Sequence, residues 1–193
     1  MMLTERQEEI INVSIEIIAN RGIQGLTIKN LSKEIGISEP AIYRHFESKT
    51  DILLAILKNF EEVSSFMNEA MKGGNGTAVS KIEFMFSKII EIFSMEPSHI
   101  SVIFSEEIFK NEEVLKEKIV EIMNSKQKSI EELLIDGQQK GEIRDDIDHK
   151  TLALIVIGSL RFMVKQWDLK NQYENLNEEG QKLIEGLKLI VTK

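Results

Sequence analysis

The chain has 193 residues, 42% of them hydrophobic and 29% charged, with a net charge of −8 and no cysteine. This composition allows one medium domain, or a small domain joined to a larger one, and excludes disulfides, thiolate zinc sites and a cysteine nucleophile. No apolar run approaches the roughly 20 residues that span a bilayer, and the first residues lack the apolar stretch of a signal peptide, so a cytoplasmic location is expected.

The negative charge is not spread evenly along the chain. Residues 1–60 hold seven Lys or Arg against eight Asp or Glu, whereas residues 61–193 hold seventeen against twenty-four. Between Thr27 and Thr50 the four basic residues outnumber the three acidic ones. Only this segment is expected to approach a polyanion such as DNA without strong repulsion.

Apolar residues recur at helical rather than alternating spacing along nearly the whole chain, and only two prolines interrupt it. This pattern predicts an all-α protein of about nine helices, whose limits are marked by glycines, prolines and capping residues. The first helix is expected to end near Gly22. The others are expected at about residues 28–35, 39–45, 48–71, 77–95, 98–109, 111–139, 148–168 and 176–192.

The segment from Leu26 to Phe46 has the features of a helix-turn-helix, in which two short helices cross through a tight turn. Gly36 is suited to the left-handed conformation that closes the first of them. Ser38 is a good N-cap for the second, and Pro40 falls in its first turn, where a missing N–H costs nothing. The residues expected to pack inside the motif are Ile28, Leu31, Ile35, Ile37 and Ile42.

The turn by itself would fit an ordinary helical hairpin equally well. The residues that follow favour DNA, because four side chains that can donate to phosphate crowd into seven positions. They are Tyr43, Arg44, His45 and Lys49. Ser48 also caps the next helix, with an acid three residues later, and the exposed N–H groups of such a helix favour an anion. The N-terminal end of the second helix is therefore predicted to enter the major groove.

The stretch from Thr27 to Leu54 resembles the DNA-binding signature of TetR-family transcriptional regulators. With the first helix and Arg21-Gly22, the resemblance covers about the first 60 residues. It implies an all-helical homodimer with a three-helix DNA-binding domain, a connecting fourth helix and a larger C-terminal ligand-binding and dimerisation domain. The matching elements are Thr27-Ile28, Leu31, Gly36-Ile37-Ser38, Ile42-Tyr43-Arg44-His45-Phe46, Ser48-Lys49 and Ile52-Leu53.

The resemblance implies backbone contacts from Thr27, Tyr43, His45 and Lys49. Three alternatives stay open: Tyr43 is half in the core, His45 is a solvent-facing cap, and Lys49 is merely solvated. Glu39 stands where many family members carry Arg, Lys or Gly. Its carboxylate cannot contact phosphate favourably, so two alternatives stay open: it accepts from cytosine N4, or it points outward. The predicted DNA-binding set is Thr27, Lys29, Ser38, Glu39, Pro40, Ala41, Tyr43, Arg44, His45 and Lys49.

Residues 73–76, Gly-Gly-Asn-Gly, form the clearest break in the chain. A phosphate-binding loop would need a preceding strand and a following Gly-Lys-Ser/Thr, and since both are missing we interpret the segment as a linker. The predicted organisation is a helix-turn-helix domain over residues 1–48, with its motif at about 28–47, a connecting helix over 49–72 and an effector-binding and dimerisation domain over 73–193.

The C-terminal part is rich in aromatic and sulfur-bearing side chains, which are typical of the wall of an apolar pocket between helices. The same residues at helical spacing are also typical of a plain core, and that alternative stays open for each of them. The predicted effector is a small, mostly apolar molecule. Its candidate wall is Phe66, Phe84, Phe93, Phe104, Met123, Phe162 and Trp167.

The sequence predicts neither a catalytic nor a metal site. His99 and His149 stand far apart, and neither has metal-type spacing. The acidic group Asp145, Asp146 and Asp148 lacks the glycine and the distal Glu of a calcium loop, so a helix-entry turn with acidic caps is the preferred interpretation. No grouping of Ser, His and Asp suggests a hydrolase, and no cofactor is expected.

The last two predicted helices are apolar over so wide an arc that they must be covered. By the resemblance they form a four-helix bundle with the same pair from a second subunit, which gives a homodimer through about residues 150–190. The residues concerned are Leu152, Ile155, Ile157, Leu160 and Phe162, followed by Leu183, Ile184, Leu187 and Ile190.

The function most consistent with these features is a ligand-responsive DNA-binding regulator without enzymatic activity. It is expected to be a repressor that leaves a palindromic operator when a small apolar molecule binds. Two other hypotheses stay open. A helical enzyme would need a convergent catalytic group in a pocket, and a DNA-binding scaffold or silencer without an effector would have a tightly packed C-terminal core.

Overall fold

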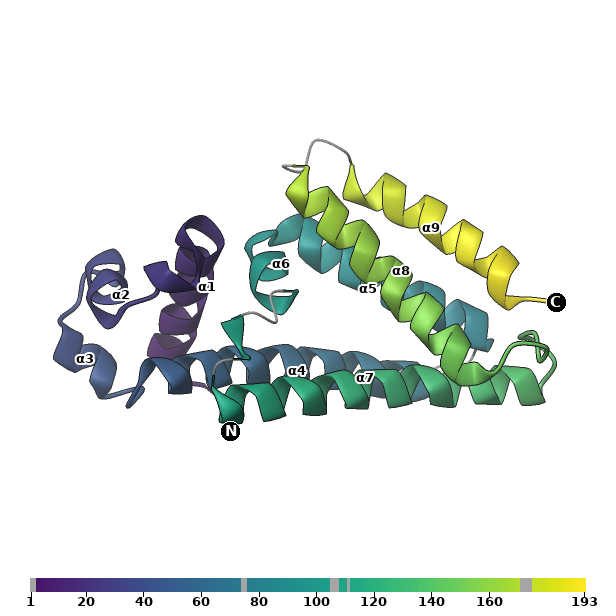
Figure 1. Ribbon diagram of the computed structural model, residues 1–193, viewed down its shortest axis with the longest axis horizontal. Helices are drawn as coiled ribbons and strands as arrows, with labels where there is room; N and C mark the ends of the chain where they lie inside the picture. The colour runs from purple at the N-terminus through teal and green to yellow at the C-terminus, as the bar shows by residue number, and fades with distance from the viewer. Residues whose placement is uncertain (1–2, 74–75, 105–107, 111, 171–174) are drawn as a thin grey trace. The chain divides into compact units, whose positions relative to one another are not determined.

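The computed structural model describes residues 3–73, 76–104, 108–110, 112–170 and 175–193, without the side chains of residues 64, 66–68 and 70–73. This described part contains nine α-helices and no strand (Figure 1), which confirms the all-α prediction. None of its helices is both long and apolar enough to cross a membrane. The helices are α1 Glu5–Gly25, α2 Ile28–Ile35, α3 Glu39–Tyr43, α4 Lys49–Gly73, α5 Ala78–Met95, α6 Ser98–Ile103, α7 Glu113–Gln139, α8 His149–Leu169 and α9 Leu176–Val191.

Two helix ends differ from the sequence prediction. The first helix does not end at Gly22 but continues to Gly25 across a kink, in which Gly22 has φ 67° and ψ 177°. Glycine adopts this left-handed φ without steric cost, so the chain bends there and resumes a short helical turn. The helix predicted over 98–109 is shorter, because α6 ends at Ile103.

The chain divides into two compact units, one of residues 1–63 with 98–120 and one of residues 64–97 with 121–193. Two of the three boundaries fall inside long helices, α4 and α7, and the third falls between α5 and α6. The predicted division by role, at residues 48 and 73, is a different partition and stays a prediction. Gly74 and Asn75 of the predicted linker lie outside the described residues.

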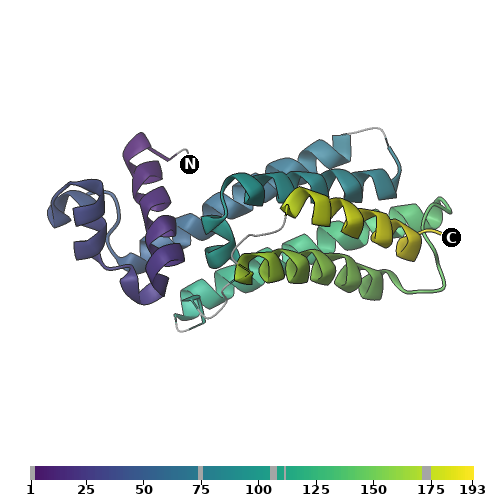
Figure 2. The ribbon, with the colours of Figure 1, turned by 90° about the horizontal axis from the view of Figure 1, so that it is seen from above.

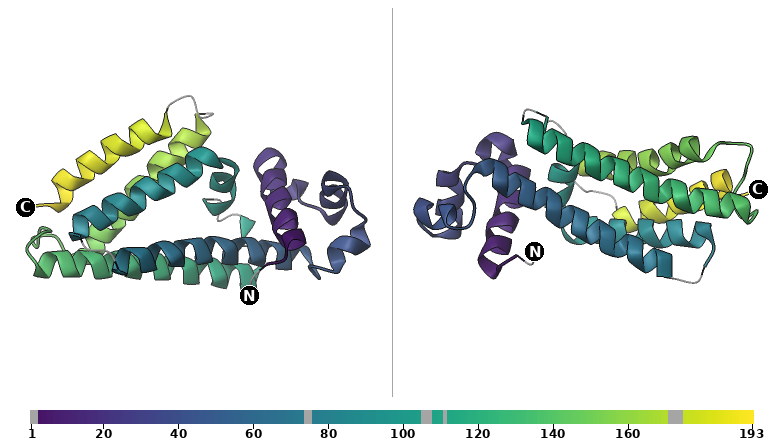
Figure 3. Two further views of the ribbon diagram at one scale, coloured as in Figure 1. Left: turned by 180° about the vertical axis from the view of Figure 1, so that it is seen from behind. Right: turned by 90° about the horizontal axis from the view of Figure 1, so that it is seen from below.

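Helix α1 is the centre of the first unit and packs against both α2 and α6 (Figure 3). Its N-terminus is closed by a capping box between Thr4 and Gln7. The buried side chains recur every three or four residues, so they form one apolar face of the helix. They are Ile10, Ile11, Ser14, Ile15, Ile17 and Ile18.

Helix α6 is fastened to the same unit by its first turn. The Ser98 hydroxyl donates to the Glu16 carboxylate of α1, and the ring of His99 meets Phe60 of α4 edge-on at 5.3 Å between centroids. Ile100 and Val102 are completely buried. Residues far apart in the sequence therefore share the core around α1.

In the second unit α8 and α9 run antiparallel and side by side, and α9 also packs on α5 (Figures 1 and 2). The α5–α9 contact is close because Gly180 has no side chain. A Cβ at that position would lie 2.2 Å from Cδ1 of Ile90. The buried core of these three helices includes Ile82, Phe86, Ile90, Phe93, Leu152, Val156, Leu160, Val164, Ile184 and Leu187.

The connection between α7 and α8 ties together the ends of two other helices in this unit. The Glu142 carboxylate accepts from the Ala78 amide at the start of α5, at 2.7 Å. Arg144 donates to the last carbonyls of α9, from its amide to Val191 at 2.8 Å and from its guanidinium to Ile190 at 3.2 Å. A carboxylate thus meets a helix N-terminus and a cation meets a C-terminus, as the helix dipole favours.

The acidic residues of this connection are caps and ion-pair partners. Asp148 is the N-cap of α8, where the Thr151 hydroxyl and the amides of Thr151 and Lys150 donate to its carboxylate and lower its pKa. Asp146 pairs with Arg144. The helix-entry interpretation is confirmed at Asp148. Among the described residues no group of acidic or histidine side chains is arranged to hold a metal ion.

Gly137 of α7 gives the first testable prediction, because it leaves no room for a side chain. A Cβ there would lie 2.7 Å from Cβ of Ala78 and 2.8 Å from the side chain of Ile143. We expect Gly137→Val to lower the free energy of unfolding by about 2 kcal/mol or more, since relief of the overlap must displace α5 or the 140–148 connection. Thermal and chemical unfolding measure the change. Asn124→Val, on the exposed face of the same helix, is the control and should change stability by only about 0.5 kcal/mol; equal stability of the two variants would contradict the prediction.

Candidate functional site

The turn between α2 and α3 has the geometry that the sequence predicts. Gly36 ends α2 at φ 79° and ψ 29°, a left-handed conformation. The amides of Gly36 and Ile37 both donate to the carbonyl of Ser32 at 3.0 Å, which closes the helix and turns the chain towards α3. The small Ser32 side chain is itself buried.

Helix α3 has only five residues and is held by one inward-facing side chain, Ile42, which is completely buried together with Leu31 of α2. Phe46 adds a buried ring directly after the helix. Of the other residues expected inside the motif, Ile28, Ile35 and Ile37 are half-buried. Ser38 occupies the N-cap position but makes no side-chain capping hydrogen bond, and Pro40 lies in the first turn, as predicted.

The opposite face of this motif is uncovered. Tyr43 is 50% exposed, so the alternative in which it lies half in the core stays open. Seven of the ten predicted DNA-binding residues are exposed, namely Thr27, Lys29, Ser38, Glu39, Pro40, Tyr43 and Arg44, and three are half-buried, namely Ala41, His45 and Lys49. All ten come from α2, α3 and the residues that flank them within the first unit.

Thr27 has two hydrogen-bonding roles available at the start of α2. Its hydroxyl oxygen accepts from the Asn30 amide at 3.1 Å and so caps the helix. Among the described residues this hydroxyl donates to no acceptor, and Lys29 lies exposed two residues further on. An exposed helix N-terminus with a hydroxyl donor and an ammonium group suits a phosphate.

Lys49 lies differently from the other basic residues of the motif. Its ammonium donates to the carbonyl of Ile23 at 2.9 Å, and burial lowers its pKa. Beside it, the Ser48 hydroxyl accepts from the Asp51 amide at 3.1 Å and donates to the Asp51 carboxylate at 2.9 Å. The predicted cap at the start of α4 is therefore confirmed.

Two side chains that sequence reasoning missed also hold the motif. Gln7 of α1 donates to the carbonyl of His45 at 3.5 Å, and Asn30 of α2 donates to the carbonyl of Gly25 at 2.9 Å. The Thr4 and Gln7 spacing marks a capping box, but no local pattern indicates that Gln7 also reaches a residue 38 positions later.

The structure places the candidate effector residues in different environments. Phe93 and Trp167 are buried, whereas Phe84, Met123 and Phe162 are 45%, 47% and 70% exposed. Phe104 is half-buried and belongs to the first unit. The side chain of Phe66 lies outside the described residues. Their role as a ligand wall stays a prediction.

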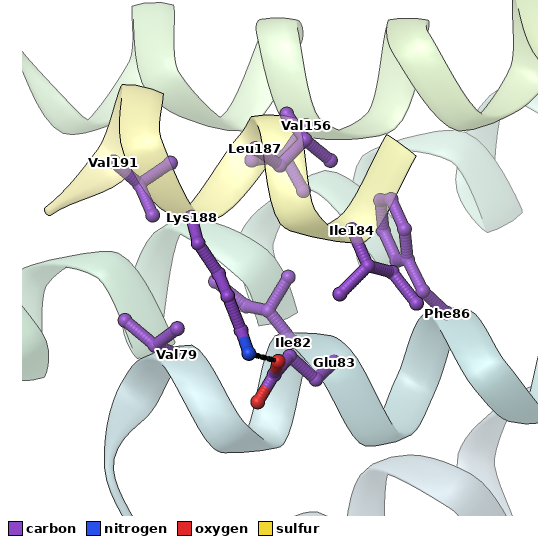
Figure 4. A pocket seen from close by; sticks show the side chains of 9 residues that line it. All are labelled: Val79, Ile82, Glu83, Phe86, Val156, Ile184, Leu187, Lys188 and Val191. Carbon is purple, nitrogen blue, oxygen red and sulfur yellow. Dashed lines mark ion pairs between the residues drawn. The ribbon is translucent and has the colours of Figure 1, made fainter. Parts of the chain in front are cut away.

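A small cavity lies in the second unit between α5, α8 and α9 (Figure 4). Its wall is apolar except at one edge, where Lys188 of α9 reaches across to Glu83 of α5 in an ion pair. The cavity volume is about 10 Å³. That is roughly what one water molecule requires and far below the ~300–1,000 Å³ of a ligand site. The lining residues are Val79, Ile82, Glu83, Phe86, Val156, Ile184, Leu187, Lys188 and Val191.

Large apolar side chains lie exposed along α8 and α9. Leu154, Phe162 and Leu169 are 67%, 70% and 71% exposed, and their spacing of eight and seven residues places them on one face of α8. Leu189 of α9 is 82% exposed. Leu160, which belongs to the apolar arc predicted from the sequence, is instead buried inside the unit at 7%.

Two family models together cover nearly the whole chain. The model of bacterial regulatory proteins of the tetR family matches residues 10–56, and the model of the YsiA-like protein C-terminal region matches residues 56–191. The chain belongs to the TetR family. Members of this family are transcriptional regulators rather than enzymes, which confirms the predicted class.

Similar proteins of this family regulate fatty acid metabolism. The fatty acid metabolism regulator protein of Bacillus subtilis is 26% identical over 171 residues, which are 87% of this chain and 86% of that protein. The crystal structure of the regulator FadR from Bacillus subtilis in complex with stearoyl-CoA has a TM-score of 0.82 at 26% identity and covers 93% of this chain and 96% of its own. The fatty acid degradation regulator FadR from Bacillus halodurans has the same fold, with a TM-score of 0.86 at 18% identity and 97% of both chains covered. This TetR-family chain is thus a ligand-responsive transcription regulator.

Proposed function

We propose that this TetR-family protein is a repressor that binds a palindromic operator as a homodimer and is released from it by a long-chain acyl-CoA. The observation that carries the DNA-binding part is the uncovered face of α2 and α3. On that face hydroxyl, guanidinium and ammonium donors are exposed while Ile42 and Leu31 anchor the motif from within.

The exposed residues divide into two roles in this proposal. Thr27, Lys29, Tyr43 and the half-buried His45 donate to the DNA backbone, where they set the register of the protein without reading sequence. At the groove end of α3 the unengaged Ser38 hydroxyl and the exposed Glu39 and Arg44 read base edges, with Pro40 and Ala41 in apolar contact beside them. A carboxylate accepts from cytosine N4, and a guanidinium donates to guanine.

A homodimer follows from the exposed apolar face of α8. Leu154, Phe162 and Leu169 are each about two-thirds exposed on a helix that, with α9, forms a layer at the surface of its unit. A soluble protein rarely leaves such a stripe uncovered, and a two-fold pairing of the α8–α9 hairpins covers it with its own copy. The operator is then palindromic because two recognition helices related by a two-fold axis read two half-sites.

The proposed effector class rests on the similar proteins. One Bacillus subtilis relative is a fatty acid metabolism regulator protein, and the structure of the Bacillus subtilis regulator FadR was solved in complex with stearoyl-CoA. An acyl chain is the mostly apolar molecule that the sequence predicts, and the exposed side chains of Phe84 and Met123 offer it apolar surface. The cavity between α5, α8 and α9 has a volume of only about 10 Å³, so these helices would have to separate to admit such a chain there.

Helix α4 provides the proposed route from effector to DNA. It begins at Lys49 in the first unit and ends at Gly73 in the second. A ligand that displaces its end moves its beginning, and with it the recognition helix. The two recognition helices of a dimer must fit sites about 34 Å apart, so a small displacement is enough to weaken binding.

The small cavity favours a second candidate, a DNA-binding protein without an effector. In that case the dense packing of α5, α8 and α9 is the functional state and no acyl-CoA binds. The effector experiment below separates the two candidates.

Selection from a random DNA library tests DNA binding. We expect an enriched inverted repeat, bound with an affinity that falls steeply with salt because phosphate neutralisation releases counterions. In the selected operator, Arg44→Ala should relax the preference at one position of each half-site and weaken binding by about 1–3 kcal/mol per contact. Recovery of no enriched sequence at low salt would contradict the proposal.

The oligomeric state tests the apolar face of α8. We expect Phe162→Glu to be monomeric in sedimentation equilibrium at micromolar concentration, whereas the unmodified protein is a dimer, because a charge in the middle of the interface cannot be desolvated without a partner. Val114→Glu, a change of an exposed apolar residue on α7, should remain dimeric. Leu160 and Leu187 are unsuitable sites, since both are buried within the unit and a charge there would unfold it. A dimeric Phe162→Glu variant would show that the interface lies elsewhere.

Calorimetry with stearoyl-CoA tests the effector. We expect binding that is about 100-fold weaker in the presence of operator, which corresponds to about 2.7 kcal/mol of coupling, and an equal loss of operator affinity when the acyl-CoA is bound. Free coenzyme A, which lacks the acyl chain, is the control and should leave operator binding unchanged. Equal affinity of stearoyl-CoA with and without operator would rule out the coupling, and no binding would favour the candidate without an effector.

A further inference from the structure

The chain crosses from one compact unit to the other within α4, between α5 and α6, and within α7. Residues 98–120 therefore belong to the first unit, although the stretches before and after them, 64–97 and 121–193, belong to the second. A displacement within the second unit can reach the DNA-binding motif through this inserted segment as well as through α4 itself.

The inserted segment is part of the core of the first unit. Ile100, Val102, Phe109 and Leu115 are all completely buried. Protein cores are close-packed, so a segment anchored in this way moves together with its neighbours rather than sliding past them. Since α7 begins in this segment and continues into the second unit, a movement of α7 also acts on the first unit.

One ion pair joins α7 to α4 inside the first unit. The Lys118 ammonium of α7 lies 2.7 Å from the Glu61 carboxylate of α4. Each of the two residues stands two positions before the last residue of its helix that belongs to the first unit, which is 120 for α7 and 63 for α4. The same turn of α4 carries Phe60, which the ring of His99 meets edge-on. The inserted segment thus contacts α4 just before both helices leave the unit.

The Glu61–Lys118 pair is better shielded from water than an ordinary surface pair. Its side chains are 31% and 16% exposed, whereas those of Glu113 and Lys116, an ion pair one turn earlier on α7, are 72% and 53% exposed. Water and salt screen a half-buried pair less than an exposed one. The Glu113–Lys116 pair also joins two residues of one helix, so it cannot link α7 to another element.

We propose that Glu61 and Lys118 form a coupling pair, which transmits a displacement of α7 in the second unit to α4 and so to the DNA-binding motif. The inference rests on the proposed function, in which an effector bound to the second unit weakens operator binding. It adds a route through side chains to the route along the backbone of α4.

The position of Glu61 on α4 makes this route short. Glu61 stands twelve positions after Lys49, the first residue of α4, which follows the recognition helix α3 by a short linker. At 1.5 Å per residue, that stretch of helix is about 18 Å long. A shift of Glu61 is therefore carried to the recognition helix by little more than three turns of one helix.

The test compares Lys118→Met and Glu61→Gln with the control Lys116→Met. Each of the first two removes one charge of the pair and keeps the size of the side chain. We expect stearoyl-CoA to weaken operator binding about 100-fold in the unmodified protein and in the control, but about tenfold or less in the two pair variants. Operator affinity without acyl-CoA, and stearoyl-CoA affinity without operator, should stay within about threefold in all of them, whereas damage to the fold would lower both.

Exchange of the two charges tests the pair directly. The double variant Glu61→Lys with Lys118→Glu should recover most of the coupling that each single change loses, since an ion pair of opposite sense joins the same two helices. Full coupling in Lys118→Met or Glu61→Gln would overturn the proposal. A double variant that stays uncoupled would assign the effect to local packing and would overturn it as well.

Amide hydrogen exchange provides a readout that needs no effector. Because coupling is reciprocal, operator binding should slow exchange in residues 121–130 of α7 in the unmodified protein and in Lys116→Met, but not in Lys118→Met. Equal slowing in all three proteins, or none in the unmodified protein, would contradict the coupling pair. If stearoyl-CoA does not bind, the effector part of the proposed function fails, while hydrogen exchange still decides whether the pair carries coupling.

Discussion

The first unit depends on one constraint, which is that the recognition helix has only five residues. A helix of that length forms too few internal hydrogen bonds to offset the cost of its nucleation, so its conformation must come from its surroundings. Ile42 supplies one anchor by its complete burial with Leu31, and Phe46 supplies another immediately after the helix. The left-handed turn at Gly36 fixes the angle at which the chain enters α3.

The apolar face of α1 supplies the platform for this arrangement. Its isoleucines recur at helical spacing and are nearly all buried, and α6 closes the same core from a distant part of the sequence. The motif can therefore leave its outer face uncovered without loss of order. That is a condition for reading DNA, because donors are useful only if their positions are fixed before contact.

Most of the fold could be predicted because its signals are local. Gly36, Ser48 and Asp148 each mark a helix limit through a conformation or a hydrogen bond within a few residues, and the structure has each limit as expected. Gly22 shows the limit of such reasoning. A glycine after a helical run indicates a stop, but whether the chain stops or kinks depends on what the following turn packs against.

The contacts that the sequence could not predict are those between residues far apart in the chain. Lys49 and Ile23, and likewise Glu83 and Lys188, meet only because the helices that carry them pack together. Nothing in either local sequence indicates the partner.

Periodicity also could not separate core from surface in the last helices. Leu160 and Phe162 are two positions apart, a rotation of about 200° around the helix, so they cannot face the same side. The structure buries Leu160 and exposes 70% of Phe162. Leu160 is covered by its own unit, and Phe162 is covered, in our proposal, by a second copy. The sequence shows the same wide apolar arc for both kinds of burial.

The charge distribution limits how the protein can bind DNA. With a net charge of −8, most of the molecule repels DNA, and only the segment around α2 and α3 can approach it. Part of the affinity must therefore come from fixed donors, such as the Thr27 hydroxyl and the N-terminus of α2, whose strength depends on exact placement. Binding of this kind is easily lost when the motif moves, so an effector with a coupling of only about 1–3 kcal/mol is enough to release the operator.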